Sequence, residues 1–174
     1  MRFYEALDLV PSLALDSDDL KRRFYERSRQ WHPDRFSQAG KEAQETALQR
    51  SAVLNDAFRT LRDPVKRAEY FLEENGIAAA KVPPPELLEE VFELNMALEE
   101  LRDGDESARP RLMDAQKRFL EMRGEIDTGL DELFGAYDDS KNPPLLSEIR
   151  RALDRRRYVS NLVSEVQKEL SRRN

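Results

Sequence analysis

The sequence predicts an all-α protein in two helical parts. Apolar residues recur at three- and four-residue spacing, and convincing period-two alternation is absent. The 39% hydrophobic and 37% charged residues are typical of amphipathic helices with solvated outer faces. Three consecutive prolines in the stretch 78–85 indicate a boundary. We therefore expect one domain over residues 1–76, a proline-containing linker over 77–85 and a second domain over 86–174.

The first part should hold four helices. Their expected ranges are about 3–7, 18–30, 41–62 and 64–74. Asp16 or Ser17 can cap the second helix, which must end before Pro33 because proline disfavours helical geometry at the preceding residue. An Asp-Pro pair ending at Pro64 starts the fourth helix, and an Asn-Gly pair ending at Gly76 stops it. The buried face expected on the third helix is Ala47, Leu54, Ala57, Phe58 and Leu61.

The second part should form a bundle of three helices. We expect them at about 85–101, 107–137 and 144–171, joined by short links that suit antiparallel packing. Gly124, Gly129 and Gly135 weaken the middle helix, so the sequence allows a bend or break there.

Composition excludes several classes of function. The chain has no cysteine and one histidine, which argues against thiolate chemistry and against cysteine or histidine metal sites, so no metal and no cofactor are expected. A net charge of −6 argues against general nucleic-acid binding. The short apolar runs and the polar N-terminus predict no membrane span and a cytoplasmic location. No catalytic triad, phosphate loop or distinctive carboxylate pair indicates an enzyme.

The second helix carries a concentration of positive charge. Between Leu20 and Trp31 there are five basic residues and one acidic residue, a local net of +4 that suits an acidic partner surface. A His32-Pro33-Asp34 turn follows, in which Pro33 fixes its own φ and restricts His32, while Asp34 can accept backbone N–H groups. Such a rigid, exposed corner suits docking better than chemistry, because no nucleophile or second base lies beside His32 in sequence.

These residues resemble a J-domain in content, order and spacing. The matching segments are Phe3-Tyr4-Glu5-Ala6-Leu7, Leu20 to Asp34, and Asp63-Pro64-Val65-Lys66-Arg67-Ala68-Glu69-Tyr70. The resemblance implies a helical hairpin with two short flanking helices, and stimulation of ATP hydrolysis by a DnaK-type chaperone. It implies that His32, Pro33 and Asp34 form the triggering turn, with Lys21, Arg22, Arg27 and Arg29 as electrostatic contacts. Phe71 departs from the Asp of many J-domains, and the glycine/phenylalanine-rich linker and zinc-binding cysteines of DnaJ itself are absent.

The second half resembles the HscB family in layout. The segment Arg67-Ala68-Glu69-Tyr70-Phe71-Leu72, the proline link, an acidic helix and two further helices follow in that order. HscB proteins are J-type co-chaperones of iron–sulfur cluster assembly. The resemblance implies two partners, a DnaK- or HscA-type chaperone and an IscU-type scaffold as client.

A candidate client surface emerges from helical periodicity. Leu88, Phe92 and Met96 form a second apolar stripe about 120° from the stripe expected to face the bundle core, at Leu87, Val91, Leu94, Leu98 and Leu101. A surplus apolar face is a candidate docking site. Tyr158 lies off the core stripe of the last helix and is expected to be exposed. By resemblance the scaffold docks on Leu88, Phe92, Glu93, Met96 and Tyr158.

Other interpretations remain open at this stage. Leu88, Phe92 and Tyr158 could pack against the first domain or a neighbouring helix, and surplus apolar faces could be buried in a homodimer. The nine acidic residues of 86–106 are expected to form a solvated face. A J-domain protein with another client is one alternative function, and a helical nucleic-acid-binding protein that uses the basic second helix is another.

Overall fold

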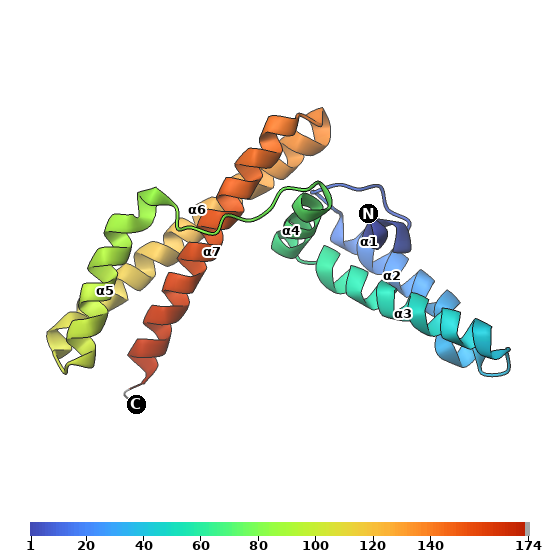
Figure 1. Ribbon diagram of the computed structural model, residues 1–174, viewed down its shortest axis with the longest axis horizontal. Coiled ribbons are helices and arrows are strands. Elements are labelled where there is room, and N and C mark those ends of the chain that lie inside the picture. The colour runs from blue at the N-terminus through green and yellow to red at the C-terminus, as the bar shows by residue number, and fades with distance from the viewer. Residues whose placement is uncertain (173–174) are drawn as a thin grey trace. The chain divides into compact units, whose positions relative to one another are not determined.

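The computed structural model describes residues 1–172, and every regular element within that range is helical (Figure 1). The predicted all-α class is confirmed. The elements in chain order, with η for a 3-10 helix, are α1 (Arg2–Ala6), α2 (Ser17–Trp31), η1 (Pro33–Phe36), α3 (Lys41–Leu61), α4 (Pro64–Glu74), η2 (Pro85–Leu87), α5 (Leu88–Arg102), η3 (Glu106–Ala108), α6 (Arg109–Ser140) and α7 (Pro143–Ser171). None of the described helices is long and apolar enough to cross a membrane.

Contacts divide the chain into two compact units. Unit 1 comprises Met1–Ile77 and Phe134–Asn142, and unit 2 comprises Ala78–Leu133 and the described part of Pro143–Asn174. The end of α6 and its link to α7, which the sequence places in the second domain, therefore group with unit 1. The Asp138 carboxylate accepts the backbone N–H groups of Leu13 and Ala14 at 2.9 and 2.7 Å within that unit. The expected boundaries at 76 and 86 stay a prediction.

Unit 1 is built on the α2–α3 hairpin. Helices α1 and α4 both pack on α3, and Phe24 of α2 stacks on Phe58 of α3 with ring centroids 4.2 Å apart. Phe58 is half-buried, whereas Ala47, Leu54, Ala57 and Leu61 are buried as expected. The Tyr4 hydroxyl donates to the Ser12 carbonyl at 2.7 Å, and burial raises the pKa of Tyr4 above its usual value.

Side-chain caps define where the helices of unit 1 begin. The Asp16 carboxylate accepts the N–H groups of Asp18 and Asp19 at 2.8 and 3.1 Å, which satisfies two orphan donors of α2. Asp63 caps α4 in the same way, and Pro64 takes the first helical position. The short 3-10 helix η1 begins just after α2, at Pro33, and leads into the link to α3.

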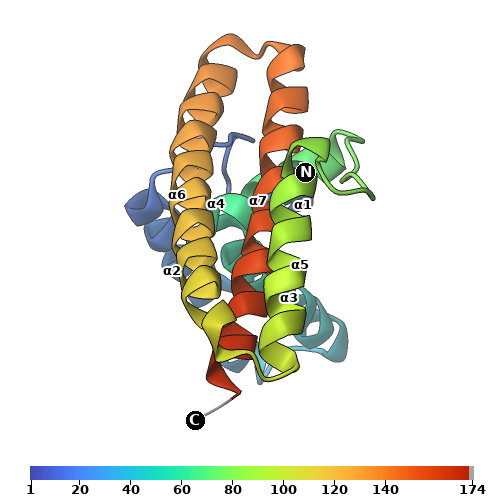
Figure 2. The same cartoon turned by 90° about the vertical axis from the view of Figure 1, so that its left-hand side faces the viewer.

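Unit 2 is a bundle in which α5, α6 and α7 lie side by side (Figure 2). Its buried cluster consists of Leu87, Leu94, Ala97, Leu98, Leu101, Ala108, Leu112, Ala115, Phe119, Val159, Leu162, Val163 and Val166. Helix α6 runs unbroken over 32 residues, so the break allowed at its three glycines does not occur. Each glycine costs about 1 kcal/mol relative to alanine, and the buried Leu112, Ala115, Phe119 and Leu130 outweigh that cost.

Candidate functional site

The His32-Pro33-Asp34 turn is an exposed corner between α2 and η1. His32 is extended, with ψ of 128°, because Pro33 excludes helical geometry there. The side chains of His32 and Asp34 are 59% and 90% exposed. The His32 Nδ1 accepts the backbone N–H of Asp34 at 3.3 Å and lies 3.6 Å from the Asp34 carboxylate. The solvent-facing corner that the sequence predicts is therefore present, and its rigidity stays a prediction.

A shallow hollow of about 380 Å³ lies beside this corner. Tyr25, Ser28, Arg29, His32 and Arg35 line it. The Arg35 guanidinium donates to the Arg29 carbonyl at 3.1 Å, which ties the corner to the last turn of α2. Sequence reasoning missed Tyr25 and Arg35 as site residues. The signal that could have found Tyr25 is an aromatic among the basic residues of α2, one position away from the buried stripe.

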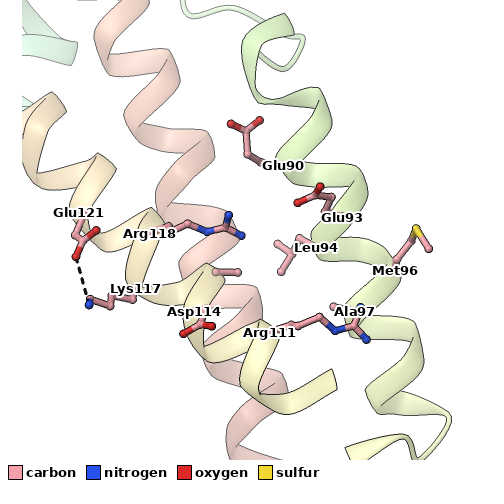
Figure 3. Close-up of a pocket in the computed structure, with 11 residues that line it drawn as sticks. Glu90, Glu93, Leu94, Met96, Ala97, Arg111, Asp114, Lys117, Arg118 and Glu121 are labelled. Carbon is pink, nitrogen blue, oxygen red and sulfur yellow. Dashed lines mark ion pairs between the residues drawn. The ribbon is translucent and has the colours of Figure 1, made fainter. Parts of the chain in front are cut away.

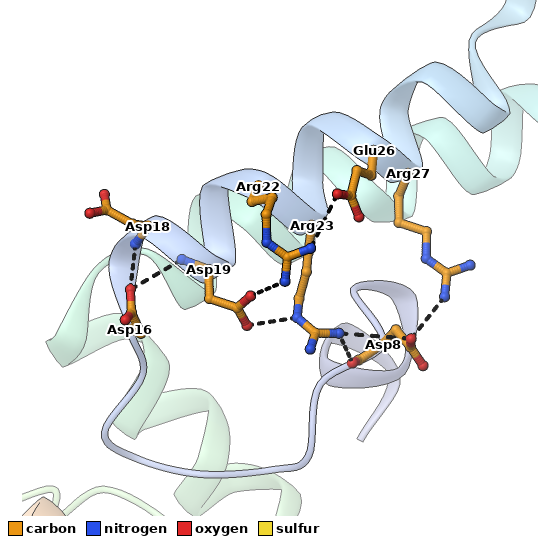
Figure 4. A network of polar contacts seen from close by, with 8 residues as sticks. All are labelled: Asp8, Asp16, Asp18, Asp19, Arg22, Arg23, Glu26 and Arg27. Atoms are coloured by element: carbon orange, nitrogen blue, oxygen red, sulfur yellow. Dashed lines mark hydrogen bonds and ion pairs between the residues drawn. The ribbon is translucent and has the colours of Figure 1, made fainter.

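The basic residues of α2 take part in an exposed network of ion pairs (Figure 4). Arg22 pairs with Asp19 and Glu26, and Arg23 pairs with Asp19 at 2.7 Å. Hydrogen bonds from Arg23 and Arg22 hold the pKa of Asp19 below its usual value.

A carboxylate from outside the helix also joins this network. The Asp8 carboxylate, just after α1, lies 3.7 Å from Arg23 and 3.4 Å from Arg27. Lys21 faces Asp18 at 3.7 Å, whereas Arg29 forms no ion pair with any described residue. The net charge of +4 was counted over residues 20–31 alone and therefore overstates the charge of this face. Solvent-exposed pairs contribute about 0–1 kcal/mol each, so a partner's carboxylates can replace them.

The second apolar stripe of α5 is exposed, as its spacing predicts. The side chains of Leu88, Phe92 and Met96 are 56%, 67% and 47% exposed. Together with exposed Glu93 they form the surface that we name the α5 patch. Its opposite face is held in the bundle by the buried Leu87, Leu94, Leu98 and Leu101.

Tyr158 departs from its expected exposure. It is half-buried on α7 and packs against the cluster of unit 2, with the Arg157 guanidinium 5.8 Å from its ring centroid. Position on the helical wheel failed here because the bundle cluster that Tyr158 packs against is assembled from several helices. Any docking role of Tyr158 is therefore combined with a packing role.

A groove of about 720 Å³ between α5 and α6 adjoins the α5 patch (Figure 3). Met96 and Glu93 belong to both surfaces, and Leu94, Ala97 and Ala115 also line the groove. Its α6 wall is of mixed charge, where Lys117 pairs with Glu121 on the same helix. The groove depends on how two helices pair, so the sequence alone did not reveal it.

The described residues offer no metal site, since none of their His, Asp and Glu side chains form a group of three that could hold an ion. His32 lies 3.6 Å from the Asp34 carboxylate, and both side chains are exposed. The arrangement provides hydrogen-bonding groups and charges for a protein surface.

Comparison with known proteins agrees with both halves. Residues 2–70 match the DnaJ domain family, and residues 83–167 match the family described as the HSCB C-terminal oligomerisation domain. Two similar relatives are co-chaperone protein HscB homologs, from Shewanella loihica and Vibrio vulnificus. The Shewanella protein is 29% identical, over 97% of this chain and 96% of its own length. The Vibrio vulnificus protein is 28% identical, over 96% of this chain and 95% of its own length.

Solved structures share this fold. The chaperone HscB from Vibrio cholerae matches with a TM-score of 0.67 and 27% identity, over 97% of this chain and 96% of that one. Human co-chaperone protein HscB matches with a TM-score of 0.69, over 96% of this chain and 81% of that one. The two sequences are 24% identical, so this likeness concerns the fold alone. An N-terminal J-domain and a C-terminal bundle of three helices are thus confirmed, and the chain belongs to the HscB family of J-domain co-chaperones.

Proposed function

We propose that this co-chaperone stimulates ATP hydrolysis by a DnaK- or HscA-type chaperone and delivers an IscU-type scaffold protein to it. The observation that carries the proposal is the exposed His32-Pro33-Asp34 corner at the end of the basic helix α2. The corner would trigger the ATPase, and Lys21, Arg22, Arg27 and Arg29 would provide the electrostatic contacts. Complementary charge mainly accelerates encounter and fixes orientation, so binding should weaken with added salt.

Steady-state ATPase assays with purified candidate chaperones test the first step. His32→Gln removes the imidazole, and we expect it to abolish stimulation while circular dichroism and thermal unfolding stay unchanged, because His32 is exposed. Gln38→Ala, at an exposed residue beyond the turn, is the matched control and should stimulate normally. Normal stimulation by the His32 variant would refute the trigger.

The α5 patch supports the client step of the proposal. Three exposed apolar side chains in one stripe, flanked by glutamates, fit a partner that presents an apolar surface with basic neighbours. The five site residues proposed for the scaffold are Leu88, Phe92, Glu93, Met96 and Tyr158. Of these, Phe92 has the most exposed large apolar side chain and is our first choice for the anchor.

Calorimetry with a purified IscU-type scaffold tests this step. The double variant Leu88→Ala with Phe92→Ala should weaken binding at least about tenfold, which corresponds to about 1.4 kcal/mol, and leave stimulation by the co-chaperone alone intact. Met113→Ala is the control, because Met113 is also apolar and exposed but lies on α6, outside the α5 patch. Unchanged affinity of the double variant would refute the patch and leave the ATPase step standing.

The remaining parts of the proposal concern where the protein acts and what it does not bind or catalyse. The protein would act in the cytoplasm through these two protein partners, with no catalysis of its own and without a membrane or nucleic acid. A salt-dependent gel shift tests the last point, because tight nucleic-acid binding at physiological salt would contradict it.

A further inference from the structure

The indole of Trp31 is held by residues on both sides of the trigger corner. Trp31 ends α2 directly before His32, and Phe36 ends η1 two residues after Asp34. Their rings are stacked, with centroids 5.9 Å apart and an angle of 3° between the planes. The stack therefore joins the two ends of the corner across the tripeptide.

A cation from the opposite helix of the hairpin contacts the same indole. The guanidinium carbon of Arg50 lies 3.9 Å from the centroid of the Trp31 ring, well inside cation–π range. Arg50 forms no ion pair with any described residue, so the indole is its principal contact. Arg50 and Phe36 line different hollows beside Trp31, which indicates that they approach the indole from different sides.

Helix α3, which carries Arg50, is packed into the core of unit 1. Ala47 and Leu54, three residues before Arg50 and four after it, are both buried in unit 1. The same helix also holds the far end of the loop, since the Gln44 side-chain amide donates to the carbonyls of Ser37 and Ala39 at 3.3 and 2.9 Å. By contrast, the side chains of His32 and Asp34 are exposed, and His32 Nδ1 contacts only the backbone N–H and the carboxylate of Asp34 among the polar groups of the described residues. The orientation of the corner thus depends on its neighbours.

We propose that Arg50 is a positioning residue for the His32-Pro33-Asp34 corner and acts through the indole of Trp31. The inference rests on the proposed ATPase stimulation, which it refines by naming what orients the trigger. Loss of the guanidinium would free one side of the indole and let the corner sample orientations that do not engage the chaperone.

Arg50→Gln tests the proposal with three readouts. Trp31 is the only tryptophan of the chain, so its fluorescence reports on this site alone. We expect stronger quenching by acrylamide, faster hydrogen exchange at residues 32–36 and a threefold to tenfold loss of maximal ATPase stimulation, on the order of a partly desolvated cation–π contact. Arg59→Gln, which removes another exposed arginine from the same helix, is the matched control and should change none of the three.

A double-mutant cycle separates positioning from direct contact with the chaperone. In a Trp31→Leu background, Arg50→Gln should cause no further loss of stimulation, because the partner through which it acts is gone. Additive losses would show that Arg50 touches the chaperone itself and would overturn the proposal, as would unchanged fluorescence and exchange in the single variant. Trp31→Met replaces Trp31→Leu if the latter fails to fold by circular dichroism.

Failure of the proposed function has a different signature. If the wild-type protein stimulated no candidate chaperone, the ATPase step would be refuted. Quenching and hydrogen exchange would still decide whether Arg50 orders the corner, since neither readout needs a partner.

Discussion

Arg150 and Asp154 form a buried ion pair on one face of α7. The Arg150 guanidinium donates to the Asp154 carboxylate at 2.9 Å, and each side chain is only 8% exposed. The same carboxylate accepts the backbone N–H of Ala80 at 3.1 Å, and Arg157 donates to the Ala80 carbonyl at 2.7 Å. Both backbone groups of Ala80 are therefore held by α7, close to the start of the chain segment that leads into α5.

Asp154→Ala is expected to destabilise unit 2 by about 3 kcal/mol, because it removes a buried carboxylate that accepts hydrogen bonds from the Arg150 guanidinium and from the backbone N–H of Ala80. The measurement is the free energy of unfolding from urea titrations. Asp154→Asn keeps an acceptor oxygen and loses the charge, so its free energy of unfolding should lie between those of the wild type and Asp154→Ala. Asp56→Ala removes a carboxylate from an exposed pair at 3.9 Å and should cost less than about 0.5 kcal/mol. Equal losses for Asp154→Ala and Asp56→Ala would contradict the buried pair.

Gly129→Ala in α6 is expected to stabilise the protein by about 0.5–1 kcal/mol. A Cβ at this position meets nothing within 4 Å, so alanine gains helix propensity without a clash. Gly76 is the contrasting control, since its φ of +75° favours glycine and Gly76→Ala should destabilise by about 1 kcal/mol. Thermal unfolding of both variants checks the signs, and a lower stability for Gly129→Ala would reveal packing at that glycine.

The local signals in the sequence predicted most of the fold. Helix ends and the exposed corner could be inferred directly, because the residues that determine them act on backbone groups only a few positions away. These residues are Asp16, Pro33, Asp63 and Pro64. The features that were missed depend on contacts between elements. Asp8 reaches the basic face of α2 from another segment, Tyr158 packs against the cluster of unit 2, and Phe134–Asn142 groups with unit 1. None of these relationships leaves a periodic signal.

Acid should weaken unit 2 through Glu169. The hydrogen bond from Arg102, at 2.9 Å, lowers the pKa of Glu169 below its ordinary value of 4.5. A lowered folded-state pKa means that this stabilisation is fully present above pH 4.5 and is lost as the pH falls through the folded-state pKa. The unfolding free energies of wild type and Glu169→Gln should therefore converge as the pH falls from about 7 to about 3. A difference that stayed constant over that range would exclude the ionised pair as its source.

Phe92 and Tyr158 should separate docking from packing. Phe92 is 67% exposed, so Phe92→Ala should change the free energy of unfolding by less than about 0.5 kcal/mol while weakening scaffold binding. Tyr158 packs against the cluster of unit 2, so Tyr158→Ala should cost about 2 kcal/mol of stability, between a surface and a core truncation. Urea unfolding gives the first quantity and calorimetry with an IscU-type scaffold the second. Tyr158→Phe keeps the packed ring and should restore most of the stability, so any remaining loss of affinity belongs to the hydroxyl. If Tyr158→Ala left stability unchanged, its ring would not be part of the bundle core.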